Sequence, residues 1–235
     1  MNKTQASELN PKPLQINKNT PMNILNKLPL IQTPLDKTQY YRKRCNKKQI
    51  VLHHTVSNGI AENVIAGWNK NAPHIATAFV IAGDGTIHQC FYSEYWAHHL
   101  GVKAQNNTVL NQQSIGIELC SWGPLEYRNN KFYNTYNQEV TNTEIQHYKN
   151  AYRGHHYYQR YNPKQLASLQ ALLFYLCIRY KIPMDYDPQI WEVHQGALNS
   201  KPGIYSHVSY RKDKADCHPQ EELVEVLKEL KSVNI

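Results

Sequence analysis

Two stretches of this chain gather residue types that bind metal ions or move protons. The first, residues 50–55, is an apolar, β-branched run with two adjacent histidines, His53 and His54. The second covers residues 207–219 and holds several polar candidates: His207, Lys214, Asp216 and Cys217. Because Val, Ile and Thr favour strands, the first stretch predicts imidazoles on a rigid element. Chemistry at one site requires the fold to bring the two stretches together.

A zinc site is the chemistry that these residue types favour. Zinc takes three protein ligands from His, Cys or carboxylate side chains, and a catalytic ion keeps one further position for water. The candidates are one member of the pair His53/His54, then His207, and either Asp216 or Cys217. Eight residues separate His207 from Asp216, enough for a loop to return both side chains to one ion. For each histidine alone, the alternative is a surface or core residue whose hydrogen bonds are already made and which binds no metal.

Glu118 and Lys214 are the candidates for proton transfer and charge stabilisation. Glu118 interrupts the apolar run 114–119, and a carboxylate is seldom buried without a partner. A salt bridge at the sheet edge is its alternative role. Lys214 lies two residues before Asp216. An ion at Asp216 would place this lysine beside the reacting centre, where it could stabilise an oxyanion. Otherwise Lys214 is a solvated loop residue.

Interleaved strand and helix patterns must position these residues, which predicts an α/β fold. Strands are predicted at residues 49–55, 74–82, 86–91, 114–119 and 191–194, with a hairpin turn at 83–85. Helices are predicted at 62–70, 163–180 and 220–231. Asn162 and Pro163 supply the cap and the first position of the longest helix. Its leucine stripe predicts a core face.

The remaining segments are polar. Residues 1–45 are rich in Asn, Lys, Gln, Thr and Pro. They predict an extended arm, packed through the apolar patch at 24–31 on a single domain of residues 46–235. Residues 105–113 predict a polar loop. Residues 124–161 are tyrosine-rich with little apolar periodicity, and predict a long irregular excursion of the functional kind.

Composition narrows the class of protein and of partner. The 235 residues carry a net charge of +8, which favours anionic polymers such as nucleic acid, anionic membranes or wall glycopolymers. The basic segment 42–48 keeps nucleic-acid binding open as an alternative. Five widely spaced cysteines predict free thiols and a reducing compartment. No secretory signal or membrane-spanning run is expected, so we expect synthesis in the cytoplasm and no membrane insertion.

Five motifs appear in one order along the chain. They are His-His-Thr at 53–55, Phe-Val-Ile-x-x-Asp-Gly-Thr-Ile at 79–87, His-x-Gly at 99–101, Ser-Ile-Gly-Ile-Glu at 114–118, and His207 followed by Lys-x-Asp-x-x-Pro at 214–219. Together they resemble the zinc-dependent N-acetylmuramoyl-L-alanine amidases of the amidase-2 type, which include phage lysis enzymes and peptidoglycan recognition proteins. The resemblance covers about residues 49–231.

The resemblance implies a central mixed β-sheet flanked by helices, with one Zn²⁺ in an open groove. It implies His53, His207 and Asp216 as the zinc ligands, with Cys217 as the fallback for the third. His54 then turns to the other face of its strand, because side chains alternate along a strand.

It also implies catalytic roles for Glu118 and Lys214, and substrate contacts from His99, Thr77 and Trp96. The chain departs from the family at 77–78, where some phage members have Tyr-His and this sequence has Thr-Ala. A tyrosine role in proton transfer therefore does not carry over to this position.

These residues imply a hydrolase that cuts the amide bond between N-acetylmuramic acid and L-alanine. Its partner would be bacterial peptidoglycan, and we expect a monomer that does not bind nucleic acid. We favour a phage-type lysis enzyme that reaches the cell wall through a holin. The alternatives are a cytoplasmic muropeptide-recycling amidase and a non-catalytic peptidoglycan-binding module.

Overall fold

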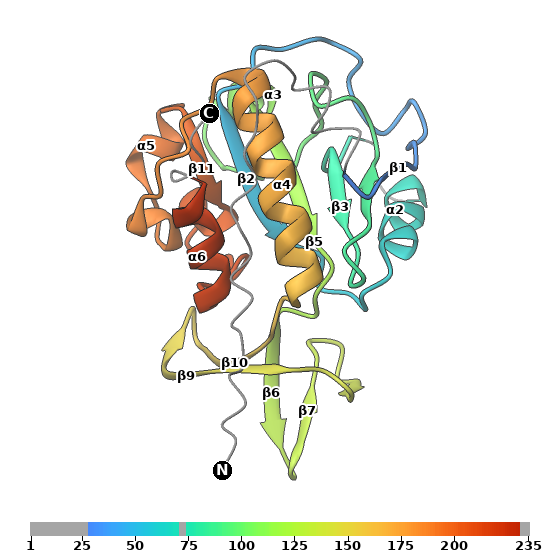
Figure 1. The fold of residues 1–235 in the computed structure, drawn as a ribbon, viewed down its shortest axis with the longest axis vertical. Helices are drawn as coiled ribbons and strands as arrows, with labels where there is room; N and C mark the ends of the chain where they lie inside the picture. Colours follow the sequence, from blue (N-terminus) through green and yellow to red (C-terminus); the bar gives the residue numbers. More distant parts are fainter. Residues whose placement is uncertain (1–27, 71–73, 231–235) are drawn as a thin grey trace, which may run out of the picture.

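A computed structural model describes residues 28–70 and 74–230 of the chain. Its centre is a six-stranded mixed sheet in the order β1-β4-β3-β5-β2-β11 (Figure 1). The strands are β1 (Leu30–Gln32), β2 (Gln49–His54), β3 (Phe79–Ile81), β4 (Ile87–Gln89), β5 (Ser114–Leu119) and β11 (Gly203–Ser206). Strands β3, β5, β2 and β11 are parallel, and β4 is antiparallel to β3. The expected α/β class with a central mixed sheet is confirmed.

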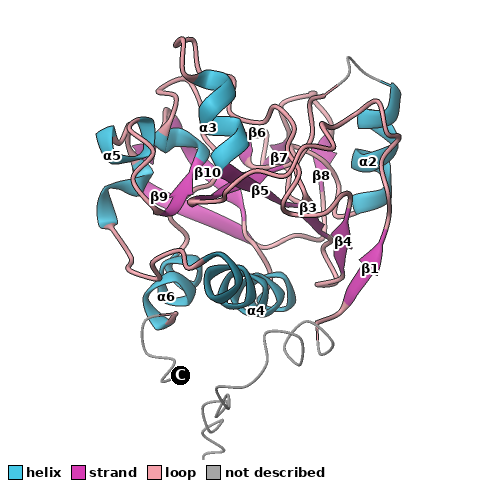
Figure 2. Cartoon of the chain, turned by 90° about the horizontal axis from the view of Figure 1, so that it is seen from above, coloured by secondary structure: helices cyan, strands magenta, loops and turns pink. Residues whose placement is uncertain are grey.

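Helices cover this sheet, as Figure 2 shows from above. The helical elements are α2 (Ala61–Lys70), α3 (Asn107–Gln113), α4 (Pro163–Tyr180), α5 (Gln195–Leu198) and α6 (Glu221–Glu229), with 3₁₀ turns η1 (Pro188–Trp191) and η2 (His207–Ser209). Helices α4 and α6 lie side by side on one face of the sheet, and α3 lies on the other. No helix among the described residues is long and apolar enough to cross a membrane.

Helix α4 is built as its sequence predicts. The Asn162 side chain accepts a hydrogen bond from the Gln165 backbone amide, and the Gln165 side chain accepts one from the Asn162 backbone amide, which completes a capping box. Pro163 occupies the first turn, and the helix ends at Lys181 in a left-handed conformation. The expected core stripe is buried throughout: Leu166, Leu169, Leu172, Leu173, Leu176 and Cys177. Helix α6 also buries one apolar face, made of Leu223, Val226, Leu227 and Leu230.

Residues 124–161 are folded, which corrects the expectation of an irregular excursion. They form a second, antiparallel sheet in the order β8-β7-β6-β10-β9. Its strands are β6 (Pro124–Arg128), β7 (Lys131–Tyr133), β8 (Glu139–Val140), β9 (Ile145–Tyr152) and β10 (His155–Gln159). Two-residue turns at Asn129-Asn130 and Arg153-Gly154 hold both residues at positive φ, the geometry of tight hairpins. These turns were the signal in the sequence.

Other predicted boundaries were also wrong. Residues 107–113 form helix α3 rather than a loop, because the buried side chains of Leu110 and Asn111 anchor a helical turn. Residues 191–194 are not a strand: the chain leaves η1 there and caps α5 with His194. The last strand of the central sheet is β11 instead. Part of the apolar patch at 24–31 lies outside the described residues, but Leu28 and Leu30 pack against the core.

Candidate metal centre

Strand register brings the two histidine stretches together. Strands β2 and β11 are parallel neighbours, and Leu52 pairs with Ser206. The next residue along each segment is a histidine: His53 is the second-last residue of β2, and His207 directly follows β11. Their ring centroids are 4.4 Å apart, and their Nδ1 atoms are separated by 3.1 Å.

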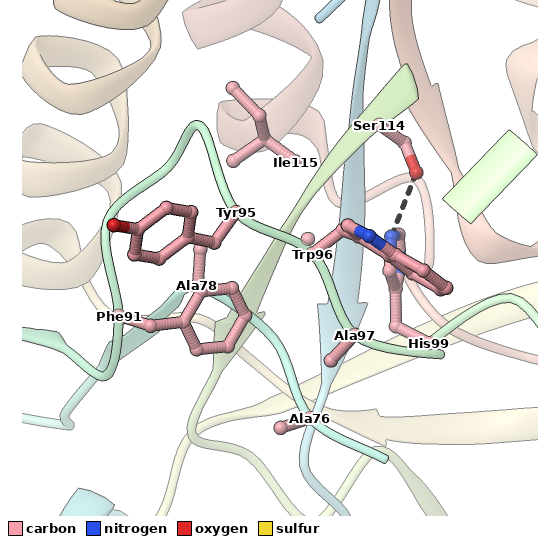
Figure 3. A pocket seen from close by; sticks show the side chains of 10 residues that line it. Ala76, Ala78, Phe91, Tyr95, Trp96, Ala97, His99, Ser114 and Ile115 are labelled. Atoms are coloured by element: carbon pink, nitrogen blue, oxygen red, sulfur yellow. Dashed lines mark hydrogen bonds between the residues drawn. The ribbon is translucent and has the colours of Figure 1, made fainter. Parts of the chain in front are cut away.

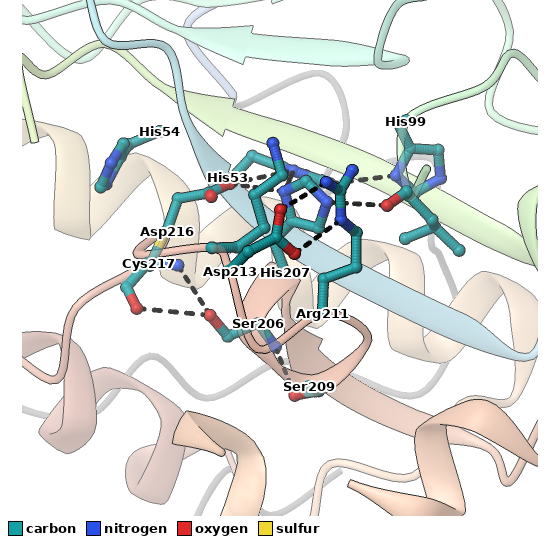
Figure 4. A network of polar contacts seen from close by, with 12 residues as sticks. His53, His54, His99, Ser206, His207, Ser209, Arg211, Asp213, Asp216 and Cys217 are labelled. Carbon is teal, nitrogen blue, oxygen red and sulfur yellow. Dashed lines mark hydrogen bonds and ion pairs between the residues drawn. The ribbon is translucent and has the colours of Figure 1, made fainter. Parts of the chain in front are cut away.

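A short return loop brings Asp216 to the same point (Figure 4). The Val208 amide donates to the Asp216 carbonyl at 3.1 Å, and the Cys217 amide donates to the Ser206 hydroxyl at 2.6 Å. These bonds fix the backbone on both sides of the Asp216 carboxylate. Its Oδ2 lies 2.8 Å from Nδ1 of His207 and 3.2 Å from Nδ1 of His53. Three ligand-type atoms thus converge from three segments of the chain.

The convergence fits a zinc ion. Tetrahedral ligands at about 2.0–2.2 Å from zinc lie roughly 3.3–3.6 Å from one another, and the three observed separations are only slightly shorter. The ring of His207 is also oriented for it. Its Nε2 lies 2.9 Å from the Leu100 carbonyl, which can only accept, so in the neutral ring the Nδ1 lone pair faces inward. Within the described part of the chain, these three residues form the candidate metal group.

Burial and charge set the ionisation states that such a site requires. Burial, and then the neighbouring His207, lowers the pKa of His53 to about 4, so the ring is neutral at pH 7. Burial alone would raise the pKa of Asp216, but His207 and His53 outweigh it through charge and hydrogen bonds. The pKa of this carboxyl therefore lies well below its usual value. Neutral imidazole and ionised carboxylate are the forms that bind metal.

His54 and Cys217 lie outside this group. His54 points to the opposite face of β2, where its Nδ1 lies 3.1 Å from the Tyr161 hydroxyl (Figure 4). Gly123, at positive φ, packs so closely on this ring that a Cβ there would lie 2.3 Å from Nε2. Cys217 is fully buried, and burial raises the pKa of its thiol well above the ordinary value. The structure therefore brings Asp216, and not the fallback Cys217, to the two histidines.

Glu118 stands beside the centre on the neighbouring strand. It pairs in register with His53 across β5 and β2, so both side chains project from the same face. Among the described residues, its Oε2 is buried without a hydrogen-bond partner. Burial, and then repulsion from Asp216, raises the pKa of this carboxyl well above its usual value. Such an environment favours the protonated form of the carboxyl.

Lys214 sits on the return loop two residues before Asp216. Its positive charge acts to lower the pKa of both Glu118 and His53. Arg153, at the tip of the β9–β10 hairpin, donates from Nε to the Lys214 carbonyl at 3.1 Å. Its guanidinium also bonds the Lys212 carbonyl and pairs with Glu192. Arg153 of the second sheet thus stabilises the loop that carries Lys214. The sequence did not predict this contact.

The three residues expected to contact substrate, Thr77, Trp96 and His99, already have partners within the protein. Thr77 is 1% exposed, and its hydroxyl donates to the Phe79 carbonyl. Trp96 is 6% exposed and stacks on Tyr41. His99 lies against His53, and both of its ring nitrogens have protein partners. Substrate contact by these residues stays a prediction; Thr77 and Trp96 are buried, whereas His99 is partly exposed.

Comparison with known proteins decides the family. The model of a family described as N-acetylmuramoyl-L-alanine amidase (Amidase_2) matches residues 44–219, well over half of the chain. This chain belongs to that amidase family. Peptidoglycan amidase activity is therefore the expected class of chemistry. No curated protein sequence matches the chain.

Solved structures of low sequence identity share the amidase fold. The structure of PlyL is 14% identical, with a TM-score of 0.52, and the match covers 88% of this chain and 99% of that one. The PlyG catalytic domain is 16% identical, with a TM-score of 0.51 and coverage of 88% and 95%. A mutant endolysin from Bacillus subtilis is 14% identical, with a TM-score of 0.50 and coverage of 87% and 98%. At these identities the likeness concerns the fold alone.

Proposed function

We propose that this chain is a zinc-dependent peptidoglycan hydrolase that cleaves the amide bond between N-acetylmuramic acid and L-alanine. The observation that carries the proposal is the convergence of His53, His207 and Asp216 within 3.2 Å of one another, with Glu118 on the adjacent strand. In this proposal, the three converging side chains hold one Zn²⁺. When bound, zinc supplies Lewis-acid chemistry, which makes water more acidic and polarises an amide carbonyl.

The residues of the chain divide the proton and charge chemistry between them. Glu118 accepts a proton from the attacking water as its oxygen bonds to the lactyl carbonyl carbon. The Lys214 ammonium stabilises the negative charge on the carbonyl oxygen. Glu118 then returns the proton to the alanine nitrogen as the carbon–nitrogen bond breaks. The products are the muramic acid carboxylate and a stem peptide with a free L-alanine amine.

Glu118 suits this exchange because its environment favours the protonated carboxyl. Its buried Oε2 has no hydrogen-bond partner among the described residues, and the Asp216 charge opposes its ionisation. The proton that it gains is therefore retained until a stronger base, the departing amine, appears. A carboxyl on an exposed loop would have neither property.

The test is digestion of purified sacculi by metal-free and zinc-loaded protein, with mass analysis of the products. We expect one zinc per chain and release of peptides that begin with L-alanine. His207→Ala should lose both zinc and cleavage. His156→Ala, which removes an exposed histidine on β10, should lose neither. A His207→Ala protein with normal zinc content and normal digestion contradicts the assignment.

The same assay separates the alternatives. A non-catalytic module would bind muropeptides without zinc and release no amine. A recycling amidase would cut soluble muropeptides but leave intact sacculi undigested. We favour a lysis enzyme of the phage type, with delivery to the wall by a holin. The fold of PlyL, PlyG and the Bacillus subtilis endolysin supports this choice, as does the net charge of +8. Nucleic-acid binding has only the basic segment 42–48 behind it.

A further inference from the structure

The loop that carries His99 and Leu100 contacts both histidines of the candidate centre at Nε2, the ring nitrogen that faces away from Asp216. The His99 ring places Nδ1 at 3.0 Å from Nε2 of His53. The next residue, Leu100, places its carbonyl oxygen at 2.9 Å from Nε2 of His207. Two consecutive residues of one loop therefore engage the outward nitrogen of each imidazole.

The direction of these hydrogen bonds follows from Ser114. Its hydroxyl donates its one proton to the Leu110 carbonyl at 2.8 Å. Toward Nε2 of His99, at 2.8 Å, it must therefore accept, so that nitrogen carries the proton (Figure 3). Nδ1 of the neutral His99 ring is then an acceptor, and the partner nitrogen, Nε2 of His53, must donate.

The chain of bonds leaves one arrangement at the centre. With its proton on Nε2, the neutral His53 ring turns the Nδ1 lone pair toward His207 and Asp216. The Leu100 carbonyl accepts the Nε2 proton of His207, so Nδ1 of that ring also faces inward. Nδ1 of each ring then faces the Asp216 carboxylate.

The loop itself is held by a buried amide. Asn111 of helix α3 is fully buried, and its Oδ1 accepts from the backbone amides of His99 at 2.8 Å and Leu100 at 3.2 Å. Its Nδ2 donates back to the Asn107 carbonyl at 2.7 Å. Space for the His99 ring comes from Gly116 of β5, because a Cβ there would lie 3.1 Å from Nδ1.

We propose that His99 and Leu100 form a positioning element that, before metal binds, engages the Nε2 proton of each imidazole and so turns Nδ1 of His53 and of His207 toward Asp216. His99 is thus a positioning residue. The proposal rests on the proposed function for its use, but the preset tautomers are a property of the metal-free chain. Loss of a residue that hydrogen-bonds to a metal ligand typically weakens metal binding by about 10–100-fold.

The experiment compares three proteins: the full chain, His99→Leu and His99→Asn. Leucine fills the space without an acceptor, whereas the asparagine amide oxygen can occupy the place of Nδ1. Long-range ¹H–¹⁵N NMR of metal-free protein reads the tautomer of His53, and competition with a chromogenic chelator reads zinc affinity. Thermal unfolding of each variant shows whether the fold is intact.

We expect the Nε2–H tautomer at His53 in the full chain and in His99→Asn. We expect a mixture of tautomers, and zinc binding weaker by roughly 10–100-fold, in His99→Leu. A folded His99→Leu protein with the Nε2–H tautomer and unchanged zinc affinity overturns the proposal. Absence of amidase activity in a chain with the expected tautomers would refute the proposed function and leave this inference standing.

Discussion

Gly116→Ala offers a quantitative test of how the centre is packed. Gly116 lies in the middle of β5, between the sheet position of Glu118 and the Ser114 hydroxyl that holds His99. A Cβ at Gly116 would lie 2.6 Å from Cγ2 of Thr77 and 3.1 Å from Nδ1 of His99. Ordinary carbon contacts are about 3.5–4.0 Å, so the threonine methyl must move by nearly 1 Å and the imidazole by a few tenths.

The cost follows from the burial of this region. Thr77 is 1% exposed and hydrogen-bonded, so it cannot rotate away without losing its bond to Phe79. Overpacking of this kind costs about 1–3 kcal/mol. For a protein of this size, that lowers Tm by roughly 2–12 °C. Displacement of His99 should also weaken zinc binding, because Nδ1 of His99 accepts from His53.

Urea unfolding of metal-free protein, followed by circular dichroism, measures the stability term, and chelator competition measures zinc affinity. Gly67→Ala in helix α2 is the matched control, because nothing lies within 4 Å of its Cβ position. Alanine there should stabilise by about 0.5–1 kcal/mol. Adding Thr77→Ser to Gly116→Ala removes the nearest methyl and should restore part of the loss. If Gly116→Ala is as stable as the unchanged protein, the packing argument fails.

Four further outcomes are expected. Glu118→Gln should keep zinc but lower the cleavage rate by roughly 10²–10⁴-fold; unchanged sacculus digestion would remove Glu118 from the mechanism. Asp216→Asn should weaken zinc binding by more than the ~10–100-fold that follows from losing a residue that only hydrogen-bonds to a ligand. Cys217→Ala should bind zinc normally, as measured by chelator competition. Normal binding by Asp216→Asn together with weak binding by Cys217→Ala would instead favour the thiol as the third ligand. Lys47 is buried with its ammonium on two backbone carbonyls, and burial lowers its pKa to about 7. The unfolded chain therefore binds more protons above pH 7, and stability should rise by on the order of 2 kcal/mol between pH 7 and 9. Lys47→Met should lack that rise in urea titrations at the two pH values.

Local patterns predicted the elements whose signals are local. The capping residues and leucine stripe of α4, and the β-branched run of β2, match the structure because propensity and burial agree there. The second sheet was missed because its strands are mostly polar, and turns such as Asn129-Asn130 were its main signal. Strand β11 is only four residues long and gains its identity from pairing with β2.

For the candidate centre, the sequence by itself determined which residue types were available. It supplied His53, His207, Asp216 and Glu118, and the motif order that places the chain in the amidase family. Side-chain alternation along β2 showed that only one of two adjacent histidines could face the site, but not which one.

Tertiary structure decided how these residues meet. Parallel pairing of β2 with β11 sets His53 beside His207, and backbone bonds at Val208 and Cys217 turn Asp216 toward them. The His99–Leu100 loop determines which nitrogen of each ring faces inward. Such contacts join residues that are far apart in sequence, and their hydrogen-bond directions depend on partners such as the Ser114 hydroxyl. No local pattern carries that information, because it arises only when the sheet, the loop and helix α3 are packed together.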